Sequence, residues 1–455
     1  MIDEKHLLKG KKRIHFVGIG GSGMYPIVQI LVAAGYEITG SDVLPGDIVN
    51  YERALGIDVK IPHAAQNVHG AELVVYTAAI MKGNPEIEEA QRLNIPCVER
   101  SVMLGYVASL YKKPICIAGT HGKTSTTAMT TQIMVMANKD PAAVIGGKLP
   151  LINGYGKAGT GDNIIVESCE FSNTYHHLTP HTAVLLNVDA DHLDFFKTMD
   201  NLKASFRKFC ASSTDTIIVN ADDANSMEVV AGLTQNIITY GTSEGCNYRA
   251  VNAKPDHSAF WGYDLEVNGT FVTHVVLGAP GKHNVYNSMA AYAAASREGC
   301  TPQECAAGIA AFQGAGRRFE ILGVKNGITI ADDYAHHPTE LEATLNAAMQ
   351  MGFKQVWAVF QPFTYSRTKM LLDDFARVLQ IADKCVMTEI MGSRETNDEY
   401  NIYTKDLAVK IPHSVWYNTF EEVVDYVMAN AQSGDLVITL GCGDIYKAAK
   451  MMMAK

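Results

Sequence analysis

The run Gly119-Thr120-His121-Gly122-Lys123-Thr124 limits the possible folds of this 455-residue chain more narrowly than any other feature. It follows the apolar stretch PICIA and precedes a Thr- and Met-rich segment that extends to Asn138, so we expect it to join a buried strand to a helix. In that setting the backbone amides of a glycine-rich turn surround a phosphate, the lysine contacts the β- and γ-phosphates, and the threonine hydroxyl ligates Mg²⁺. Ile117 stands where the eight-residue phosphate-loop pattern begins with glycine. The run predicts a nucleoside triphosphate site; the alternative is a glycine-rich loop with an incidental lysine.

Acidic residues follow two other apolar stretches of the same region. Glu167 and Glu170 come at the end of IIVES, and the run NVDADHLD, which contains Asp189, Asp191, His192 and Asp194, continues the stretch AVLLNV. Carboxylates and a histidine at two strand ends beside a phosphate loop suggest one or two magnesium sites. The alternative is that these acidic residues only cap loops and helices.

A second glycine-rich turn lies near the start of the chain. Gly18-x-Gly20-x-x-Gly23 follows the strand-like RIHFV and precedes a segment with helical apolar spacing, and Asp42 ends the next predicted strand. Such a turn lets the backbone approach a pyrophosphate at a helix N-terminus. A sugar nucleotide, a nicotinamide cofactor of a dehydrogenase and a purely structural tight turn all remain compatible with it.

The order of predicted elements indicates an α/β protein of three domains. Strand-like and helix-like segments alternate through the first hundred residues and again after the glycines and arginines of QGAGRRFE, which predicts parallel sheets with crossover helices. Residues 247–280 instead show alternating polarity around Asn268-Gly269, which is typical of an antiparallel hairpin. We therefore expect a Rossmann-like domain at 1–110, a phosphate-loop ATPase-like domain with an antiparallel appendage at 111–318, and a doubly wound Rossmann-like domain at 319–455.

Composition excludes several classes of function. Thirty-eight basic and forty-eight acidic residues give a net charge of -10, so no general basic field is available for nucleic acid or an anionic membrane. No signal peptide and no run of about 20 apolar residues is present, and we expect a cytoplasmic protein. The nine cysteines form no C-x-x-C pair, and His176, His177 and His181 lack metal-site spacing, which favours a structural or substrate-facing role.

Three more polar clusters are candidates for ligand contacts. They are Lys282-His283-Asn284 with Asn287, the pair Arg317-Arg318, and the run from Asp332 to Pro338. Arginines at a domain joint can reach a γ-phosphate when domains close. Each cluster could equally be a surface loop.

Taken in order, these motifs resemble those of the Mur ligase family, and within it the ligases that join L-alanine to UDP-N-acetylmuramate. The resemblance rests on HFVGIGGSGM, GSD, GTHGKTSTT, VESCEF, NVDADHLD, GKHNVYN, GRRFE, DDYAHHPTE and FQPFTYSRTK, which extend from residue 15 to residue 369. It implies an ATP- and Mg²⁺-dependent ligase that forms an acyl phosphate on the lactyl carboxylate and passes the acyl group to the amine of L-alanine. The product belongs to peptidoglycan precursor synthesis.

The resemblance also implies roles for individual residues. Lys123, His192 and Arg318 would be catalytic, and Thr124, Glu170 and His192 would bind magnesium. Arg367 and Tyr365 would hold the amino acid, and His336 or His337 would lie near the nucleotide. The ATP contacts would be Gly119, Thr120, His121, Gly122, Lys123, Thr124, Ser125, Asn284, Asn287, Arg318 and Asp333. The UDP-sugar contacts would be Gly18, Gly20, Gly21, Ser22, Gly23, Ser41 and Asp42.

The chain departs from the family pattern at three places. Ser205 aligns with a carbamoylated lysine of several relatives, so no modified lysine is expected. Phe363 and Thr364 replace a histidine and an arginine, which leaves Arg367 as the carboxylate clamp. Cys169 and Phe171 flank Glu170 in place of acidic or small residues, which weakens the case for Glu167 as a metal ligand but not for Glu170.

Two other functions stay open at this stage. A recycling ligase that attaches whole tripeptides to the same nucleotide would use the same phosphate loop and differ only in its acceptor pocket. A non-catalytic protein that binds two nucleotides would have no need of Glu170 and His192.

Overall fold

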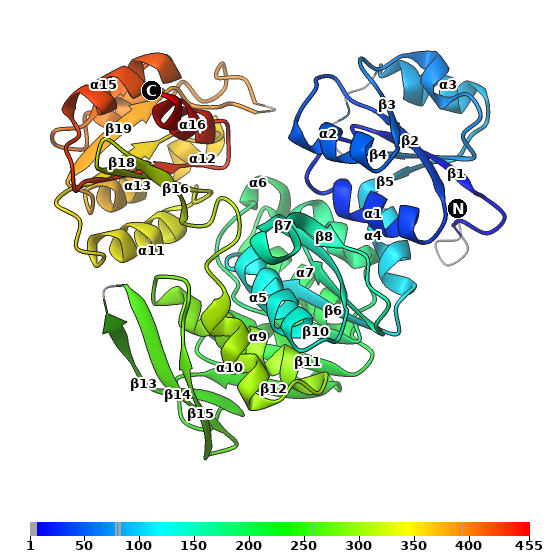
Figure 1. The fold of residues 1–455 in the computed structure, drawn as a ribbon, viewed down its shortest axis with the longest axis horizontal. Coiled ribbons are helices and arrows are strands. Elements are labelled where there is room, and N and C mark those ends of the chain that lie inside the picture. The colour runs from blue at the N-terminus through cyan, green and yellow to red at the C-terminus, as the bar shows by residue number, and fades with distance from the viewer. Residues whose placement is uncertain (1–6, 78–79, 81–82, 258, 394) are drawn as a thin grey trace. The chain divides into compact units, whose positions relative to one another are not determined.

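The computed structural model describes residues 7–77, 80, 83–257, 259–393 and 395–455, and it contains three β-sheets (Figure 1). The chain forms two compact units. The first comprises Met1–Arg249, Glu266–Thr273 and Asn287–Gly308, and the second comprises Ala250–Leu265, His274–Tyr286 and Ile309–Lys455. The predicted α/β architecture is confirmed.

The first sheet of the first unit is entirely parallel, with strand order β3-β2-β1-β4-β5. Its strands are β1 (Arg13–Val17), β2 (Glu37–Ser41), β3 (Asp58–Lys60), β4 (Leu73–Tyr76) and β5 (Cys97–Glu99), and its helices are α1 (Tyr25–Ala33), α2 (Asp47–Ala54), α3 (Pro85–Arg92) and α4 (Arg100–Ser109). Strand order reverses beside β1, and the crevice at such a point is where open α/β sheets bind ligands. The Gly18–Gly23 turn follows β1 and therefore lies there.

The second sheet holds the phosphate loop at its centre, in the strand order β12-β11-β10-β6-β9-β7-β8. The strands are β6 (Lys113–Ala118), β7 (Ala142–Leu149), β8 (Gly154–Lys157), β9 (Asn163–Glu167), β10 (Thr182–Leu185), β11 (Thr216–Asn220) and β12 (Asn236–Gly241). The α-helices along this stretch are α5 (Lys123–Met136), α6 (Leu193–Phe196), α7 (Met199–Ala211) and α8 (Ala224–Val230). Ile117 of β6 pairs with Glu167 of β9, and Ala118 pairs with Leu185 of β10. The carboxyl ends of β9 and β10 therefore flank the loop that follows β6.

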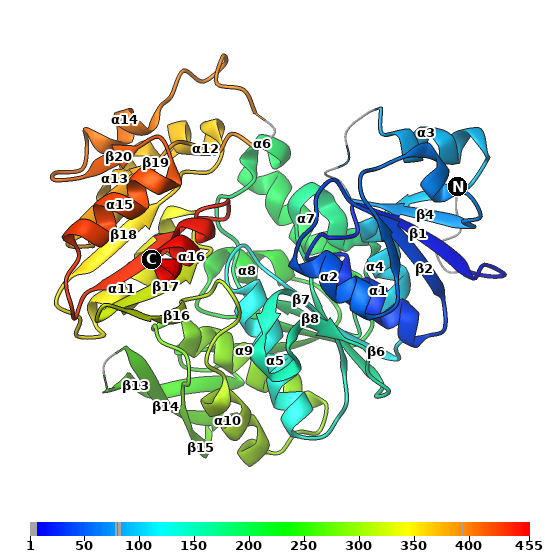
Figure 2. The same cartoon turned by 45° about the horizontal axis from the view of Figure 1, so that its top comes forward.

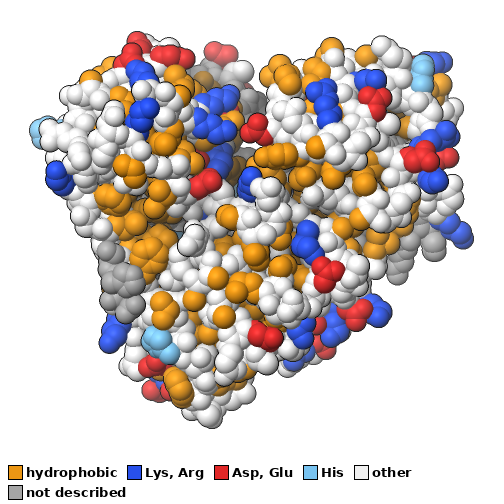
Figure 3. Space-filling view, viewed as in Figure 1, with side chains coloured by type: hydrophobic (Ala, Val, Ile, Leu, Met, Phe, Trp, Pro, Cys, Tyr) orange, Lys and Arg blue, Asp and Glu red, His pale blue; other side chains and the backbone are white. Residues whose placement is uncertain are grey.

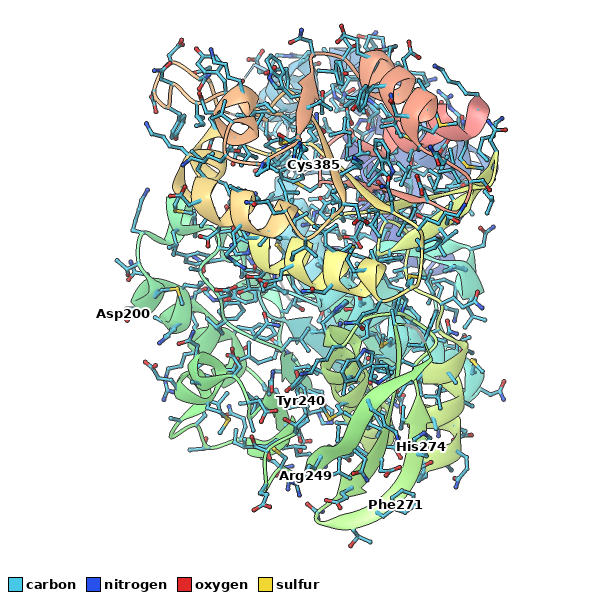
Figure 4. All side chains as sticks on the ribbon, turned by 90° about the vertical axis from the view of Figure 1, so that its left-hand side faces the viewer. Asp200, Tyr240, Arg249, Phe271, His274 and Cys385 are labelled. Carbon is cyan, nitrogen blue, oxygen red and sulfur yellow. The ribbon has the colours of Figure 1, made fainter. Side chains whose placement is uncertain are left out.

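The sheet continues beyond β12 through three strands, β13 (Tyr248–His257), β14 (Phe260–Val267) and β15 (Thr270–Val276), which follow one another in order. The Asn268-Gly269 turn joins β14 to β15, and both residues have positive φ, of 50° and 77°. Such angles suit a tight hairpin turn. Phe271 and His274 mark β15 in Figure 4. The two helices that follow are α9 (His283–Arg297) and α10 (Pro302–Ala311).

The six-stranded sheet of the second unit has helices on both faces (Figure 2). Its order is β16-β17-β21-β18-β19-β20, with β16 (Glu320–Lys325), β17 (Ile328–Asp333), β18 (Val356–Phe360), β19 (Lys384–Thr388), β20 (Val415–Tyr417) and β21 (Leu436–Leu440). Ala358 and Phe360 of β18 pack with α11 (Pro338–Met349), α13 (Leu372–Leu379) and α14 (Thr404–Ala408), whereas Trp357 and Val359 pack with α15 (Phe420–Asn430) and α16 (Tyr446–Ala454). Alternate residues of one strand thus serve two cores, as a doubly wound sheet requires.

The strands with the strongest apolar runs were predicted closely, and β1 has the bounds of the predicted strand RIHFV. Four edge strands, β3, β8, β16 and β20, were not predicted, and neither was β7. The β7–β8 and β16–β17 pairs are antiparallel, each with a register shift. Edge strands carry weak patterns because one side lacks a neighbour and one face is often exposed. Glycines at 146, 147, 154 and 156 also dilute the signal of β7 and β8.

The cysteines, the hydropathy of the helices and the surface charges of the described residues agree with what the composition predicts. All nine cysteines carry free thiols, and six of them are buried. Among these residues we find no helix with the length and hydropathy needed to cross a bilayer. Figure 3 shows basic and acidic side chains interspersed on the face that it draws.

Candidate active site

The phosphate-loop run forms a tight turn between β6 and α5. Gly119 and Gly122 have φ angles of +145° and +85°, which glycine adopts readily. A Cβ at Gly122 would lie 2.4 Å from Oδ1 of Asn287, which comes from α9. Of the predicted nucleotide contacts, Asn287 therefore lies directly against the loop.

Two residues that follow β10 hold the loop in place. Asn187 accepts a hydrogen bond from the His121 amide at 2.8 Å, and its Nδ2 donates to the His121 carbonyl at 3.0 Å. The Thr120 hydroxyl accepts from the Asp189 amide at 2.9 Å, and His121 Nε2 lies 3.1 Å from Asp189 Oδ2. The sequence analysis did not identify Asn187 as a residue that holds the phosphate loop. The feature that could have indicated it is an amide side chain at a strand end, inside the run NVDADHLD.

Lys123 begins α5 and turns its ammonium back over the loop. Its Nζ donates to the carbonyls of Gly119 and Thr120 at 2.5 and 2.9 Å and lies 3.0 Å from Glu170 Oε2. Burial by itself would lower the pKa of Lys123, but the adjacent Glu170 carboxylate outweighs burial and the pKa is raised. The ammonium therefore stays protonated at neutral pH, at the helix N-terminus where an anion is favoured.

Glu170 and His192 come together beside Lys123. Glu170 is 1% exposed, and its Oε1 lies 3.1 Å from Lys123 Nζ and 3.8 Å from His192 Nε2. The His192 ring packs against the Phe171 ring with centroids 4.9 Å apart. Three side chains that the sequence placed in one site thus form a continuous cluster. The side chain of Asp194 lies outside the described residues.

Thr124 contacts the Glu167 carboxylate at the end of β9. Its hydroxyl donates to Glu167 Oε1 at 2.9 Å, and Glu167 Oε2 accepts from the Gly146 amide at 2.7 Å. Glu167, for which the flanking residues had weakened the case as a metal ligand, is therefore a hydrogen-bond partner of Thr124. A hydroxyl and a carboxylate are oxygen donors of the kind that Mg²⁺ prefers.

The N-terminal glycine turn is held by Ser41 and Asp42. The amides of Gly18 and Ile19 donate to the Ser41 carbonyl at 2.8 and 3.0 Å, and the Gly20 amide donates to Asp42 Oδ2 at 2.9 Å. Gly18 has a φ of +78°, and a Cβ there would lie 2.6 Å from Thr77 Cγ2. The Asp42 carboxylate thus orders the turn itself.

A buried polar cluster lies beneath that turn. Glu86 of α3 is fully buried and accepts hydrogen bonds from the Ser41 hydroxyl at 2.5 Å and from Asn67 Nδ2 at 2.6 Å. His15 and His63 lie 3.4 and 3.5 Å from the same carboxylate. Burial raises the pKa of Glu86, but hydrogen bonds from His15, Ser41 and Asn67 outweigh burial and the pKa is lowered. The Ser41 side chain is accordingly engaged inside the protein.

Glu52 is a second buried acid of this region. It is fully buried on α2, and neither carboxyl oxygen has a hydrogen-bond partner. Burial, with Asp42 adding repulsion, raises the pKa of Glu52 to about 9. The group is therefore neutral at pH 7.

Arg317 and Arg318, which are adjacent in the sequence, have different surroundings in the second unit. Arg317 Nε lies 2.9 Å from Asp332 Oδ2, its Nη2 donates to the Gly441 carbonyl at 2.7 Å, and its guanidinium lies over the Tyr334 and Tyr446 rings at 4.9 and 4.8 Å. Arg317 is thus a structural link between strand ends. Arg318 lies over Tyr334 at 5.0 Å. Burial, assisted by the Arg318 charge, lowers the pKa of His283 to about 4.

Asp333 ends β17 and is 6% exposed. Its carboxylate accepts from the amides of Phe319 and Ala335, both at 2.7 Å. Burial raises the pKa of Asp333 to about 6, against the opposing effects of Arg318 and the two amides.

The histidine pair that the sequence left unresolved has two environments. His337 precedes α11, and its Nδ1 accepts from the Thr339 amide at 3.4 Å. His336 lies 3.0 Å from the Tyr334 carbonyl and 3.4 Å from Glu340. Asn284 donates to the Pro280 carbonyl at 2.7 Å.

Arg367 and Tyr365 lie on the short helix α12 (Tyr365–Met370). Thr364 precedes it with a φ of 65° and gives no side-chain cap. Glu395 supplies the cap instead, because it accepts from the Ser366 amide at 2.9 Å and from the Ser366 hydroxyl at 2.5 Å. Burial raises the pKa of the Cys442 thiol to about 12, and the Arg367 charge opposes that rise.

The fold and the clusters define a multidomain α/β protein built around a phosphate loop with a lysine, carboxylates and a histidine. Three family descriptions match it in order: "Mur ligase family, catalytic domain" over residues 13–112, "Mur ligase middle domain" over residues 117–295, and "Mur ligase, glutamate ligase domain" over residues 317–443. The chain belongs to the Mur ligase family.

Comparison with individual relatives supports this family membership. A UDP-N-acetylmuramate–L-alanine ligase of Caldanaerobacter subterraneus is 40% identical over 448 residues, which are 97% of each chain. One from Alkaliphilus metalliredigens is 39% identical over 449 residues, with 98% and 97% coverage. The crystal structure of the UDP-N-acetylmuramate–alanine ligase MurC of Thermotoga maritima superposes with a TM-score of 0.83 at 26% identity, covering 97% of this chain and 98% of that one. A murein peptide ligase of Psychrobacter arcticus shares the fold at 22% identity, with a TM-score of 0.75 and coverage of 97% and 98%.

Proposed function

We propose that this chain joins UDP-N-acetylmuramate to L-alanine at the expense of ATP. Full-length relatives that are 37–40% identical carry that name, whereas the murein peptide ligase, which represents the tripeptide alternative, resembles the chain in fold alone. The observation that carries the proposal is the cluster of Lys123, Glu170 and His192 at the phosphate loop.

The reaction explains why such a cluster is needed. A carboxylate is a poor electrophile, so its oxygen first attacks the γ-phosphorus of ATP and releases ADP, which gives an acyl phosphate. The amine of L-alanine then attacks the acyl carbon, loses a proton, and expels phosphate to leave the amide. Both steps gather negative charge where several anions already lie, so fixed positive charge stabilises their transition states.

The central residues have distinct tasks in this proposal. The loop amides from Gly119 to Ser125 hold the β-phosphate, and the Lys123 ammonium, which now contacts Glu170, bridges to the γ-phosphate. Thr124 and Glu170, with His192 at a second position, would hold Mg²⁺; the oxygen set around Thr124 also makes Glu167 a candidate ligand. When bound, Mg²⁺ neutralises phosphate charge.

Each substrate is assigned to one part of the chain. Residues 1–110 would bind the UDP-sugar at the Gly18–Gly23 turn with Ser41 and Asp42, residues 111–318 would bind ATP, and residues 319–455 would bind the amino acid. Arg318 would contact phosphate, Asn284, Asn287 and Asp333 would contact the nucleotide, and Arg367 with Tyr365 would hold the alanine carboxylate. Support comes from the reversal of strand order beside β1, where open α/β sheets bind ligands, and from the cap that orients α12.

A product assay tests the proposal. Purified protein with ATP, Mg²⁺ and UDP-N-acetylmuramate should release ADP only when L-alanine is added, and mass spectrometry should find the alanyl nucleotide. Strong preference for the tripeptide L-alanyl-γ-D-glutamyl-meso-diaminopimelate would instead indicate the recycling reaction. Binding of both nucleotides without any ADP release would indicate a non-catalytic protein.

A further inference from the structure

We propose that Ser205 and Asn173 are positioning residues that hold Glu170 in the geometry needed for metal-nucleotide binding. The inference deepens the proposed function and rests on it for the role of Glu170. Neither residue touches the phosphate loop; they act through the turn that carries Glu170.

The turn after Glu170 is conformationally strained. It opens the 3₁₀ segment η4 (Phe171–His177), in which Ser172 and Asn173 have φ/ψ angles of 55°/23° and 58°/26°. Two successive non-glycine residues in the left-handed region are unfavourable and persist only where neighbouring groups fix them. Something outside the turn must therefore hold it.

Ser205 of α7 provides that restraint. Its hydroxyl donates a short hydrogen bond to Asn173 Oδ1 and lies 2.9 Å from the Tyr175 hydroxyl. Because the single Ser205 proton goes to Asn173, Tyr175 is the donor in the second bond. Tyr175 is 1% exposed and stacks on Phe209 of the same helix, with centroids 4.8 Å apart. Asp200 marks the first turn of α7 in Figure 4.

The turn passes this restraint to the active-site cluster. The Asn173 amide donates to the Glu170 carbonyl at 2.9 Å, and the Thr174 hydroxyl donates to the Cys169 carbonyl at 2.9 Å. Phe171, between Glu170 and the strained pair, packs on His192. Freeing Asn173 would let the turn relax and move Glu170 relative to Lys123 and His192.

Two variants release the turn by different routes. Ser205→Ala removes the anchor and keeps the strain. Asn173→Gly removes the anchored side chain and lets that residue adopt positive and negative φ alike, so the left-handed conformation is no longer fixed. Ser212→Ala is the matched control, because the Ser212 hydroxyl donates to the Phe209 carbonyl at the end of the same helix, away from the turn. Glu170→Gln removes the carboxylate itself and shows how far Mn²⁺ binding weakens without it.

The primary readout is Mn²⁺ binding to the full-length protein with a non-hydrolysable ATP analogue, measured by electron paramagnetic resonance. We expect Ser205→Ala and Asn173→Gly to weaken Mn²⁺ binding roughly 10-fold, the size of effect typical of residues that orient metal ligands. In turnover assays the half-saturating Mg²⁺ concentration should rise by the same factor, with KM for the UDP-sugar unchanged. Ser212→Ala should match the wild type.

Wild-type Mn²⁺ affinity in folded Ser205→Ala or Asn173→Gly protein would overturn the proposal, and so would a Glu170→Gln variant that binds Mn²⁺ normally. If Ser205→Ala does not fold, the Mn²⁺ affinity of Asn173→Gly alone decides whether the proposal holds. Failure of the proposed function looks different: the wild type would show no alanine-dependent ADP release, while the Mn²⁺ measurement could still support the positioning role.

Discussion

At the scale of single residues, Lys123 shows how the site keeps a buried charge. Its side chain is 14% exposed, yet the Glu170 carboxylate and two loop carbonyls surround the ammonium. A buried charge is tolerated only when it is paired and hydrogen-bonded. In the proposed function, an arriving γ-phosphate would take the place of Glu170 as the partner of Lys123 and would leave that carboxylate available to a metal ion.

We expect Lys123→Ala to lower ADP formation by at least about 100-fold, because one fixed donor at a developing anion is worth that much. Rates are measured at saturating UDP-N-acetylmuramate and L-alanine, with circular dichroism to verify folding. Lys112→Ala, which removes an exposed lysine paired with Asp162, is the control and should keep full activity. Undiminished turnover of the Lys123 variant would contradict the assigned role.

Glu52 makes a separate, pH-dependent contribution to stability. Its folded-state pKa of about 9 lies above the ordinary value of 4.5. A raised pKa means that the folded protein holds the proton more tightly than the unfolded chain. The contribution is therefore complete below about pH 4.5 and is lost as the pH rises toward 9.

We expect Glu52→Gln to remove this dependence. Between pH 5 and pH 8, the free energy of unfolding of the wild type should fall relative to the variant by about 1.4 kcal/mol per pH unit. Urea denaturation at several pH values measures the difference. Glu37→Gln, at an exposed site on β2, is the control, and parallel pH profiles for wild type and Glu52→Gln would refute the buried-acid account.

At the scale of elements, α12 illustrates a helix whose start is set from a distant part of the chain. Thr364 is not a usable cap in its left-handed conformation, and Glu395 caps the helix across twenty-nine residues. The sequence signals of a helix cap lie in residues next to the helix start, so this distant cap could not be predicted.

Glu395→Ala should lower the free energy of unfolding by about 1 kcal/mol, the usual worth of a helix cap. If Arg367 holds the alanine carboxylate, the KM for L-alanine should rise several-fold while the KM for ATP stays unchanged. Steady-state kinetics with each substrate varied in turn measures both constants. Glu399→Ala removes an exposed acid of the same loop and should leave both values unchanged; an equal rise in both would point to general damage.

At the scale of the whole molecule, a chain with a net charge of -10 has to bind the two anionic nucleotides of the proposed reaction through local positive groups. In the proposed function Lys123, Arg318 and Arg367 supply this positive charge, and helix N-termini at α1 and α5 add partial positive charge. The two glycine turns follow strands of different sheets, β1 and β6. Ligands of the two turns should therefore stabilise the protein independently.

We expect UDP-N-acetylmuramate at 100 times its Kd to stabilise the folded protein by about 2.7 kcal/mol and to raise Tm by several degrees, in the wild type and in Lys123→Ala alike. A non-hydrolysable ATP analogue with Mg²⁺ should raise Tm only in the wild type. Differential scanning fluorimetry measures both shifts. NAD⁺ serves as the control, and a clear shift with it would revive the dehydrogenase interpretation of the Gly18–Gly23 turn.

The sequence by itself determined the α/β class, most of the buried strands and both glycine turns, because apolar periodicity and glycine conformation are local properties. It also placed Lys123, Glu170 and His192 in one region, since parallel strands end at a common edge. Only the tertiary structure decided that Arg317 is structural, that Asn187 holds the phosphate loop, that Glu167 pairs with Thr124 and that Glu395 caps α12. Each of these depends on contacts between segments far apart in the chain, and no local pattern encodes which of two similar side chains meets a distant partner.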